Sequence, residues 1–231
     1  MTFKPLNEND TVNTRTLLHE AIPVTGSIVS GTYTSDGNIK NYSHGMFQSV
    51  YDYPYLSSSA NHIFDVTVGY SNNSILSAST STQNAKKINI YNQMAQVLVG
   101  FDHTGSVREF DRDGDLSTGT KLKECVFVNF ARLLTKDEIK KASFTMSFAT
   151  GGRVITPDFT NRETISDYEA DTTYKVNSPA GEYGILYTAS SPIAGTGVGL
   201  IYYQAGVAVL TSSLFDSEFG ARAGVYDTSS I

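Results

Sequence analysis

The sequence predicts an α+β fold dominated by antiparallel β-sheet, sandwich-like in outline, with two or three short helices. Three observations support this prediction. Short runs rich in valine, isoleucine, phenylalanine and tyrosine recur along the chain, separated by glycine, serine and asparagine. One longer segment, 83–99, has helical spacing instead. The chain has 231 residues, 40% of them hydrophobic, which is enough for a core without covalent cross-links.

The strand predictions rest on apolar residues that alternate or stand between turn signals. The clearest case is HIFDVTVGYS, in which Phe64, Val66 and Val68 share one face. The glycine-broken segment 199–214 predicts two strands joined by a tight turn near Gln204–Gly206. Further strands are predicted from Ile22, from Glu124, from Ser143, near Tyr174–Val176 and over Tyr183–Thr188.

The clearest helix is predicted over Gln83–Val99. Its apolar residues Ile88, Tyr91, Ala95 and Leu98 fall on one stripe, as they do in a helix that packs one side on a core. The glycine that follows this segment is typical of a helix C-terminus.

Two shorter helices are also predicted. The aromatic-rich segment Tyr42–Tyr51 has apolar residues at helical spacing, and it ends before Pro54 because a residue ahead of proline avoids helical angles. The segment Thr135–Lys141 opens with Thr135 and Glu138 in the arrangement of a capping box, which predicts one or two helical turns.

We expect an extended N-terminal arm over residues 1–22 and a single β-rich domain over 23–231, with a subdivision near residue 150 left open. The arm lies on a neighbouring subunit or forms a mobile tail, and the sequence favours neither. Segment 162–173 is predicted to be a polar loop. The chain start lacks the layout of a signal peptide, and we expect no membrane span because no run of about 20 apolar residues occurs.

The charge pattern argues against nucleic acid as the main partner. The formal net charge is −6, and acidic residues outnumber basic ones beyond residue 151, so that surface repels phosphate. Lysines between Lys121 and Lys141 alternate with acids and indicate a solvated face. The single cysteine, Cys125, allows no intrachain disulfide, fits a reducing compartment during folding and is expected to be buried.

The stretch FDRDGDLSTGTKL resembles the start of an EF-hand loop, with Asp111, Asp113 and Asp115 at positions 1, 3 and 5. Position 6 is leucine rather than glycine, and position 12 is Leu122 rather than the bidentate glutamate. Glu124 lies two residues too late. We therefore expect a bend between two ordered elements and no metal or other cofactor, and we keep the three aspartates as an incomplete candidate for a calcium site.

Other motifs give no support for catalysis. GTGVG at 195–199 matches neither nucleotide-binding glycine pattern, and GSIVSG is not a nucleophile elbow. The four histidines lack zinc-site spacing. A triad of His62, Asp65 and a serine has no support beyond chance, and the same holds for a glycosidase carboxylate pair.

The cluster YDYPY places Tyr51, Tyr53 and Tyr55 around a proline bend. Tyrosines of this kind stack on sugars or pack in cores and interfaces. The chain has no tryptophan, which sugar platforms tend to contain, so packing is favoured and glycan binding is not expected.

Five stretches carry a resemblance to a known group: NTRTLLHEAIPVTGSIVSGTY, ANHIFDVTVGYS, FVNFARLLTKDEIKKASFTMSF, YKVNSPAGEYGILYTASS and GVGLIYYQAGVAVLTSSLF. Together they resemble virion structural proteins of T4-like tailed phages, of the marine or cyanophage type. The resemblance covers most of the chain and includes no catalytic motif. It implies a structural component of the tail, baseplate or neck.

We therefore expect a non-enzymatic subunit of a tailed-phage virion, made in the host cytoplasm and placed at the tail baseplate or neck. Its expected partners are other phage structural proteins and copies of itself, held by strand-edge pairing and burial of tyrosine- and phenylalanine-rich surface. Two alternatives stay open. One is a host-surface binding module of a tail fibre that uses the YDYPY region, and the other is a hydrolase with an unrecognised site.

Overall fold

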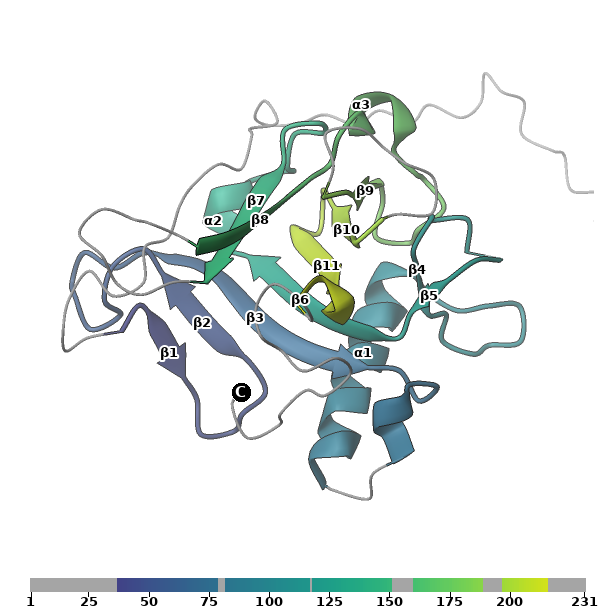
Figure 1. Ribbon diagram of the computed structural model, residues 1–231, viewed down its shortest axis with the longest axis horizontal. Coiled ribbons are helices and arrows are strands. Elements are labelled where there is room, and N and C mark those ends of the chain that lie inside the picture. Colours follow the sequence, from purple (N-terminus) through teal and green to yellow (C-terminus); the bar gives the residue numbers. More distant parts are fainter. Residues whose placement is uncertain (1–36, 79–81, 117, 151–159, 189–196, 216–231) are drawn as a thin grey trace, which may run out of the picture.

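A computed structural model describes residues 37–78, 82–116, 118–150, 160–188 and 197–215. Its centre is a seven-stranded antiparallel sheet (Figure 1). The strands, in spatial order, are β1 (Ile39–Asn41), β2 (Gln48–Tyr51), β3 (His62–Tyr70), β6 (Glu124–Phe130), β11 (Val207–Thr211), β10 (Gly199–Tyr202) and β9 (Tyr183–Leu186).

Two hairpins and a few helices complete the described part of the fold. The remaining elements are β4 (Phe110–Asp111) paired with β5 (Lys121–Leu122), β7 (Thr145–Thr150) paired with β8 (Thr160–Ser166), the helices α1 (Thr82–Leu98), α2 (Arg132–Thr135) and α3 (Ala170–Thr173), and the short 3₁₀ helices η2 (Ile75–Ala78) and η3 (Ser212–Phe215). The predicted α+β class, dominated by antiparallel sheet with few short helices, is confirmed. None of the described helices has the length and apolar character of a transmembrane segment.

Four neighbouring strands, β6, β11, β10 and β9, are largely buried on both faces, and Asn129 of β6 is their one exposed residue. On one face, Phe127 and Tyr202 pack with residues of α1, and on the other Val128 and Ile201 pack with Ile165 of β8. Successive side chains of a strand point to opposite faces, so both members of each pair must be apolar. This explains why CVFVNF and GLIYY read as continuous apolar runs rather than as alternating patterns.

The helix α1 approaches the sheet most closely at Gly69 of β3. A methyl group at this position would lie 2.8 Å from the backbone nitrogen of Tyr91 and 2.9 Å from the carbonyl oxygen of Lys87. Both are main-chain atoms of the helix, so neither can swing aside. Glycine is therefore required for the helix to lie this close to the strand.

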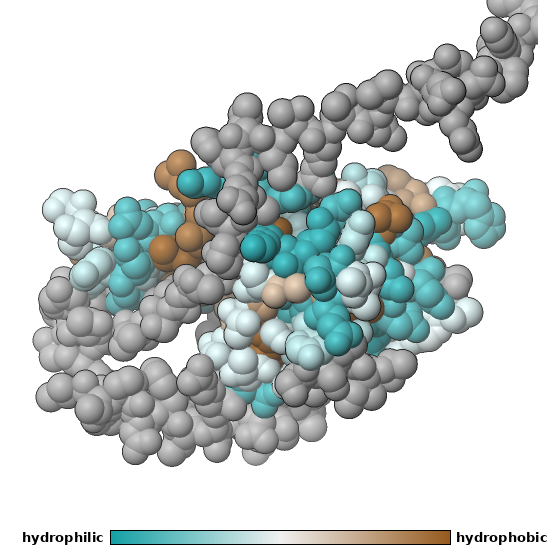
Figure 2. Space-filling model, turned by 90° about the horizontal axis from the view of Figure 1, so that it is seen from above, coloured by the Kyte–Doolittle hydropathy of each residue, from teal (hydrophilic) through white to brown (hydrophobic). Residues whose placement is uncertain are grey.

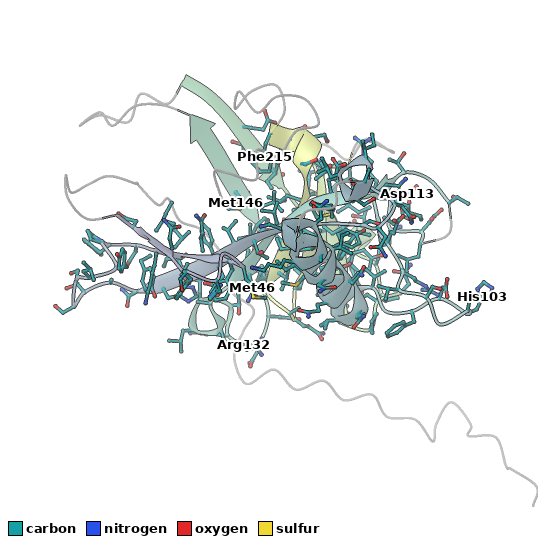
Figure 3. The ribbon with its side chains drawn as sticks, turned by 90° about the horizontal axis from the view of Figure 1, so that it is seen from below. Met46, His103, Asp113, Arg132, Met146 and Phe215 are labelled. Atoms are coloured by element: carbon teal, nitrogen blue, oxygen red, sulfur yellow. The ribbon has the colours of Figure 1, made fainter. Side chains whose placement is uncertain are left out.

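The other half of the sheet, formed by β1, β2 and the first half of β3, is less well covered, and we call it the wing. Side chains of β3 are half-buried from His62 to Val66, whereas those from Thr67 to Tyr70 are buried. The wing extends to one side of α1, with Met46 on it (Figure 3). Its outer strand β1 has no partner on its free edge among the described residues.

A buried carboxylate, Asp167, ties the end of β8 to the core. It is 1% exposed and accepts hydrogen bonds from the backbone N–H groups of Ala142 (2.8 Å) and Phe144 (2.9 Å) and from the hydroxyl of Tyr203 (2.9 Å). Burial raises the pKa of Asp167 to about 6, and these three donors act in the opposite direction. The side chain therefore fixes three chain segments to one another.

Several local predictions are confirmed. The helix α1 spans Thr82–Leu98, close to the predicted Gln83–Val99, and β3 occupies the predicted alternating segment. The predicted hairpin in 199–214 is formed by β10 and β11. Cys125 is 0% exposed, as expected. The arm at 1–22, the strand from Ile22 and the residues just after 150 lie outside the described residues.

The two short-helix predictions are wrong. The end of Tyr42–Tyr51 forms β2, because its backbone pairs with β3 and long-range pairing outweighs local spacing. At Thr135–Lys141 no helix begins. Thr135 is instead the last residue of α2, which lies before this segment. Lys136 turns the chain with a φ of 51°, and the N–H of Ile139 bonds to the carbonyl of Tyr203 (3.0 Å) rather than to a helical partner.

Two predictions in the last third are also wrong. The strand predicted near Tyr174–Val176 is an isolated bridge between Lys175 and Tyr183, preceded by the unpredicted helix α3. The polar loop predicted over 162–173 contains most of β8, which pairs with β7. A strand that packs one apolar residue on the core, as β8 does with Ile165, can be polar elsewhere and still form.

We predict that Gly69→Ala destabilises the protein by about 3 kcal/mol, because the added methyl overlaps two backbone atoms of α1. Urea unfolding of both proteins measures the difference. Gly37→Ala is the matched control, since its nearest neighbour would lie at 3.7 Å and its φ is not positive. Equal unfolding midpoints for Gly69→Ala and the wild type would contradict the close packing of α1 against Gly69.

A second prediction concerns pH. The pKa of Asp167 is raised from 3.8 to about 6, so the folded state binds this proton more tightly than the unfolded state does. The resulting stabilisation is complete below about pH 4 and is lost as the pH rises through about 6, by up to about 3 kcal/mol. Urea unfolding across this range should therefore show the stability of the wild type relative to Asp167→Asn falling as pH rises. The stability difference between the wild type and the exposed-site variant Asp171→Asn should not change with pH. A stability difference for Asp167→Asn that rises with pH would refute the raised pKa of Asp167.

Candidate functional site

The three aspartates singled out in the sequence lie in and after β4, in the loop that leads to β5. The two strands pair through Phe110 with Leu122 and Asp111 with Lys121, so the loop is closed at its base. Phe110 and Leu122 are buried against α1, and they fix this base to the core. The stretch thus connects α1 with β6, as the sequence predicted.

Tyr91 of α1 holds both strands of this base through one hydroxyl group. It donates a hydrogen bond to the carbonyl of Leu122 (2.7 Å) and accepts one from the N–H of Phe110 (3.2 Å). Its ring also meets that of Phe110 edge to face, with centroids 5.4 Å apart. Burial raises the pKa of Tyr91 above its ordinary range, so the hydroxyl stays protonated and able to donate.

Asp111 is fully buried, at 0% exposure. Its Oδ2 accepts hydrogen bonds from the N–H of Leu116 (2.8 Å) and from the ammonium of Lys121 (2.7 Å). Its Oδ1 is buried and has no hydrogen-bond partner within the part of the chain that the structure describes. Burial raises the pKa of Asp111, the ion pair with Lys121 lowers it, and the nearby Asp113 and Asp115 carboxyls raise it further.

The other two aspartates are more exposed and shape the loop. Asp113 Oδ1 accepts from the N–H of Asp115 (3.2 Å), and Asp115 accepts from the N–H (2.9 Å) and hydroxyl (2.7 Å) of Thr118. One carboxylate oxygen from each of the three aspartates lies within 4.8 Å of the others. The structure therefore brings together all three residues that the sequence offered as an incomplete metal candidate; Figure 3 places Asp113 well away from the wing.

The loop is held from a second side by residues far along the chain. The carbonyl oxygen of Gly114 accepts hydrogen bonds from the amide of Asn177 (3.0 Å) and the hydroxyl of Tyr183 (3.1 Å). Burial, and after it the charge of Asp111, raise the pKa of Tyr183 to about 12, so this hydroxyl is a donor at neutral pH. No local pattern in the sequence connects these residues with the aspartates.

The departures from the EF-hand pattern have different structural outcomes. Leu116 stands where that pattern has glycine, yet it adopts the left-handed conformation with a φ of 62°, so the turn still forms. Leu122 at position 12 is buried in the core and offers no ligand. Glu124 cannot replace it, because its two oxygens accept from Ser74 (2.7 Å) and Ser212 (3.2 Å).

The residues weighed as a catalytic triad do meet, but in the wrong order. The Ser49 hydroxyl donates to Asp65 Oδ1 (2.5 Å), and His62 Nε2 lies 2.9 Å from the same oxygen. A triad needs the histidine between the serine and the carboxylate, so that it can remove the serine proton. Here the carboxylate lies in the middle, and the group links β2 to β3.

The glycine-rich stretch 195–199 has a packing role at its described end. A methyl group at Gly197 would lie 2.6 Å from the carbonyl oxygen of Arg112, and the Gly197 carbonyl accepts from Arg112 Nε (2.7 Å). Beside it is a shallow polar pocket of about 230 Å³ with nine lining residues: Arg112, Thr120, Lys121, Leu122, Lys123, Glu124, Thr211, Ser212 and Ser213. This volume is below that of typical small-molecule sites.

The tyrosines of YDYPY lie on the wing without forming one flat platform. Tyr51 contacts Tyr55 and His62, with ring centroids 6.4 and 5.5 Å apart, while Tyr53 is 47% exposed. A second aromatic group, which the sequence reading missed, lies at the turn between β1 and β2 and consists of Tyr42, His44 and Phe47, with ring centroids 5.0–5.2 Å apart. We call it the tip cluster.

Comparison of the chain with protein-family models, with curated proteins and with solved structures finds no match.

We predict that Tyr91→Phe loosens the base of the aspartate loop. Without the hydroxyl, the buried carbonyl of Leu122 and N–H of Phe110 lose a partner, at a cost of about 2 kcal/mol. Urea unfolding measures this loss, and hydrogen exchange should accelerate at the Phe110 amide. Tyr53→Phe, which changes an exposed tyrosine, should leave both measurements unchanged. Unaltered exchange at Phe110 in the Tyr91 variant would show that the hydroxyl does not hold the loop.

Proposed function

We propose that this protein is a non-enzymatic structural subunit of a tailed-phage virion, placed at the tail baseplate or neck. The proposal draws on the resemblance of five sequence stretches to virion structural proteins of T4-like phages. Three of those stretches supply β6, β9, β10 and β11, the strands with both faces buried. The resemblance therefore concerns the residues that determine the core.

The structural observation that carries the proposal is the wing. It combines a strand without a described partner on its free edge with large apolar side chains that are exposed to solvent. The exposed fractions are 41% for Ile39, 43% for Met46, 36% for Phe47, 47% for Tyr53 and 72% for Leu56. Among the residues coloured by hydropathy in Figure 2, hydrophilic ones predominate and hydrophobic ones form small separate patches.

Packing of the wing against another subunit would bury these side chains, and each square ångström of apolar surface removed from water contributes about 25 cal/mol. The rings of the tip cluster already contact one another, so little side-chain freedom is lost on binding. The β1 strand has only three residues, so strand pairing adds a few hydrogen bonds and sets the direction of contact. Aromatic burial supplies most of the affinity.

The occupant that fits this surface is another copy of the chain in a symmetric assembly. Lys40 lies on β1 with its ammonium 5.1 Å from the centroid of the Tyr42 ring, and a lysine on a free edge opposes indiscriminate strand pairing. A partner must therefore bring an acidic group to this edge. The chain itself has a formal net charge of −6, so a second copy can supply one.

A host-surface binding module is the second candidate, and exposed Tyr53 favours it. The neighbouring Asp52 carboxylate accepts hydrogen bonds from the backbone (2.6 Å) and side-chain (2.9 Å) nitrogens of Asn61, so polar groups stand beside the ring. An aromatic ring with polar neighbours suits a sugar. In this case the isolated protein binds glycans or host cells, and Tyr53→Ala removes the binding.

We predict that the protein self-associates through the wing and that Phe47→Ser weakens the association constant about tenfold, which corresponds to about 1.4 kcal/mol. Sedimentation equilibrium on the full chain measures the constant. Immunogold electron microscopy of phage particles, with an antibody against this chain, should mark a fixed site on the tail.

Leu133→Ser is the matched control, because Leu133 is 93% exposed on α2, outside the wing. It should associate like the wild type. Absence of the protein from intact particles would refute the virion assignment. Equal effects of the Phe47 and Leu133 substitutions would refute the wing as the contact surface while leaving the virion assignment standing.

A further inference from the structure

We propose that the aspartate loop binds a divalent cation, with Ca²⁺ as the best fit, between the carboxylates of Asp111, Asp113 and Asp115. This inference is independent of any role in a virion. The sequence offered these residues only as an incomplete site, and the structure adds two observations that spacing alone does not contain. One concerns an atom of Asp111, and the other concerns the arrangement of the three carboxylates.

The first observation is the buried Oδ1 atom of Asp111. The side chain is 0% exposed, its Oδ2 is occupied by Leu116 and Lys121, and its Oδ1 has no hydrogen-bond partner among the described residues. A buried carboxylate oxygen without a partner is costly, and native proteins normally satisfy such atoms. A cation at Oδ1 provides the missing partner.

The second observation is the distance between the carboxylates. One oxygen from each aspartate lies within 4.8 Å of the others. Two oxygens bound to the same Ca²⁺ at about 2.4 Å can be up to about 4.8 Å apart, so any two of the three can share one ion, and a small side-chain movement brings in the third. Gly119 leaves room for this arrangement, because a methyl group there would lie 2.7 Å from Asp113 Oδ2.

The charge balance also favours a cation. Lys121 pairs with Asp111 through Oδ2 and also donates to the carbonyl of Thr118 (2.9 Å), so its ammonium is held on that side of the carboxylate. It offsets part of the negative charge that the three neighbouring carboxyl groups carry. A divalent ion at Oδ1 would offset more of this charge without displacing Lys121.

The choice of ion follows from the ligand chemistry. Carboxylate oxygens are hard ligands, which excludes a preference for soft, sulfur-seeking metals. Ca²⁺ accepts irregular coordination completed by water, whereas Mg²⁺ demands a near-ideal octahedron of shorter bonds. Glu124 is bound elsewhere and cannot provide the bidentate ligand of a tight site. We therefore expect a dissociation constant of about 10⁻⁴–10⁻³ M, as in weak calcium sites.

The test uses the full chain, purified with chelator and then dialysed free of it. Isothermal titration with CaCl₂ should give binding in this range, and about 10 mM CaCl₂ should raise the melting temperature by about 4 °C. MgCl₂ should bind at least about tenfold more weakly. Asp113→Asn and Asp115→Asn should each weaken Ca²⁺ binding at least about tenfold, because each removes a charged ligand.

The control is Asp102→Asn, in the loop just before β4. Three hydrogen bonds to Asp102, from Thr104 N, Thr104 Oγ1 and Ser106 N, end on Oδ1, and an asparagine can accept all three. This variant should bind Ca²⁺ like the wild type. The site variants avoid Asp111, whose buried carboxylate also supports the fold, and circular dichroism checks that both are folded.

Terbium luminescence provides a second readout on the wild type. The chain has no tryptophan, so excitation near 280 nm reaches Tb³⁺ only through tyrosine, and Tyr183 bonds directly to the loop. Terbium emission should rise on binding and fall when Ca²⁺ competes. Absence of both a calcium isotherm and terbium emission refutes the site. Binding that Asp113→Asn and Asp115→Asn leave unchanged refutes its location, and equal affinity for Mg²⁺ refutes the choice of Ca²⁺.

Discussion

The burial of four adjacent strands on both faces is the constraint on which the rest of this structure depends. Because β6, β11, β10 and β9 carry apolar side chains on both faces, other elements must cover each side of them. The helix α1 covers one side, and β8 with the segments near Ile139 and Phe144 covers the other. The aspartate loop is attached to the first of these layers through Phe110 and Tyr91, so its geometry is set by core packing rather than by the loop itself.

The same constraint explains which parts of the fold could be predicted from the sequence. The helix α1 and the strands β3, β10 and β11 have strong periods or continuous apolar runs, and burial enforces those patterns. At Tyr42–Tyr51 the local spacing indicates a helix, but pairing with β3 decides the outcome. At Thr135 the sequence has a capping signal but no helix follows, because the N–H of Ile139 bonds to the carbonyl of Tyr203 instead of to a helical partner.

The candidate site, too, could be predicted from the sequence only in part. Its three aspartates could be grouped from their spacing, since alternate positions in a short loop bring carboxylates together. The complete burial of Asp111 could not be predicted, because it depends on the β4–β5 pairing and on residues such as Tyr91 and Tyr183 that lie far away in the sequence. The wing is a comparable case, since β3 is half-buried up to Val66 and becomes buried only in the stretch where α1 packs on Gly69, a contact between distant parts of the sequence.

The buried thiol has a practical consequence. Cys125 lies on β6 in the centre of the sheet at 0% exposure, and burial raises the pKa of its thiol well above the ordinary value. Only the thiolate reacts with alkylating and disulfide reagents, so the native protein is protected from oxidation and from covalent dimerisation. Because α1 and the strands around β6 must separate before a reagent enters, the rate of thiol labelling reports the opening of the whole core. Labelling of the Cys125 thiol can therefore be used to measure the rate at which the native core opens.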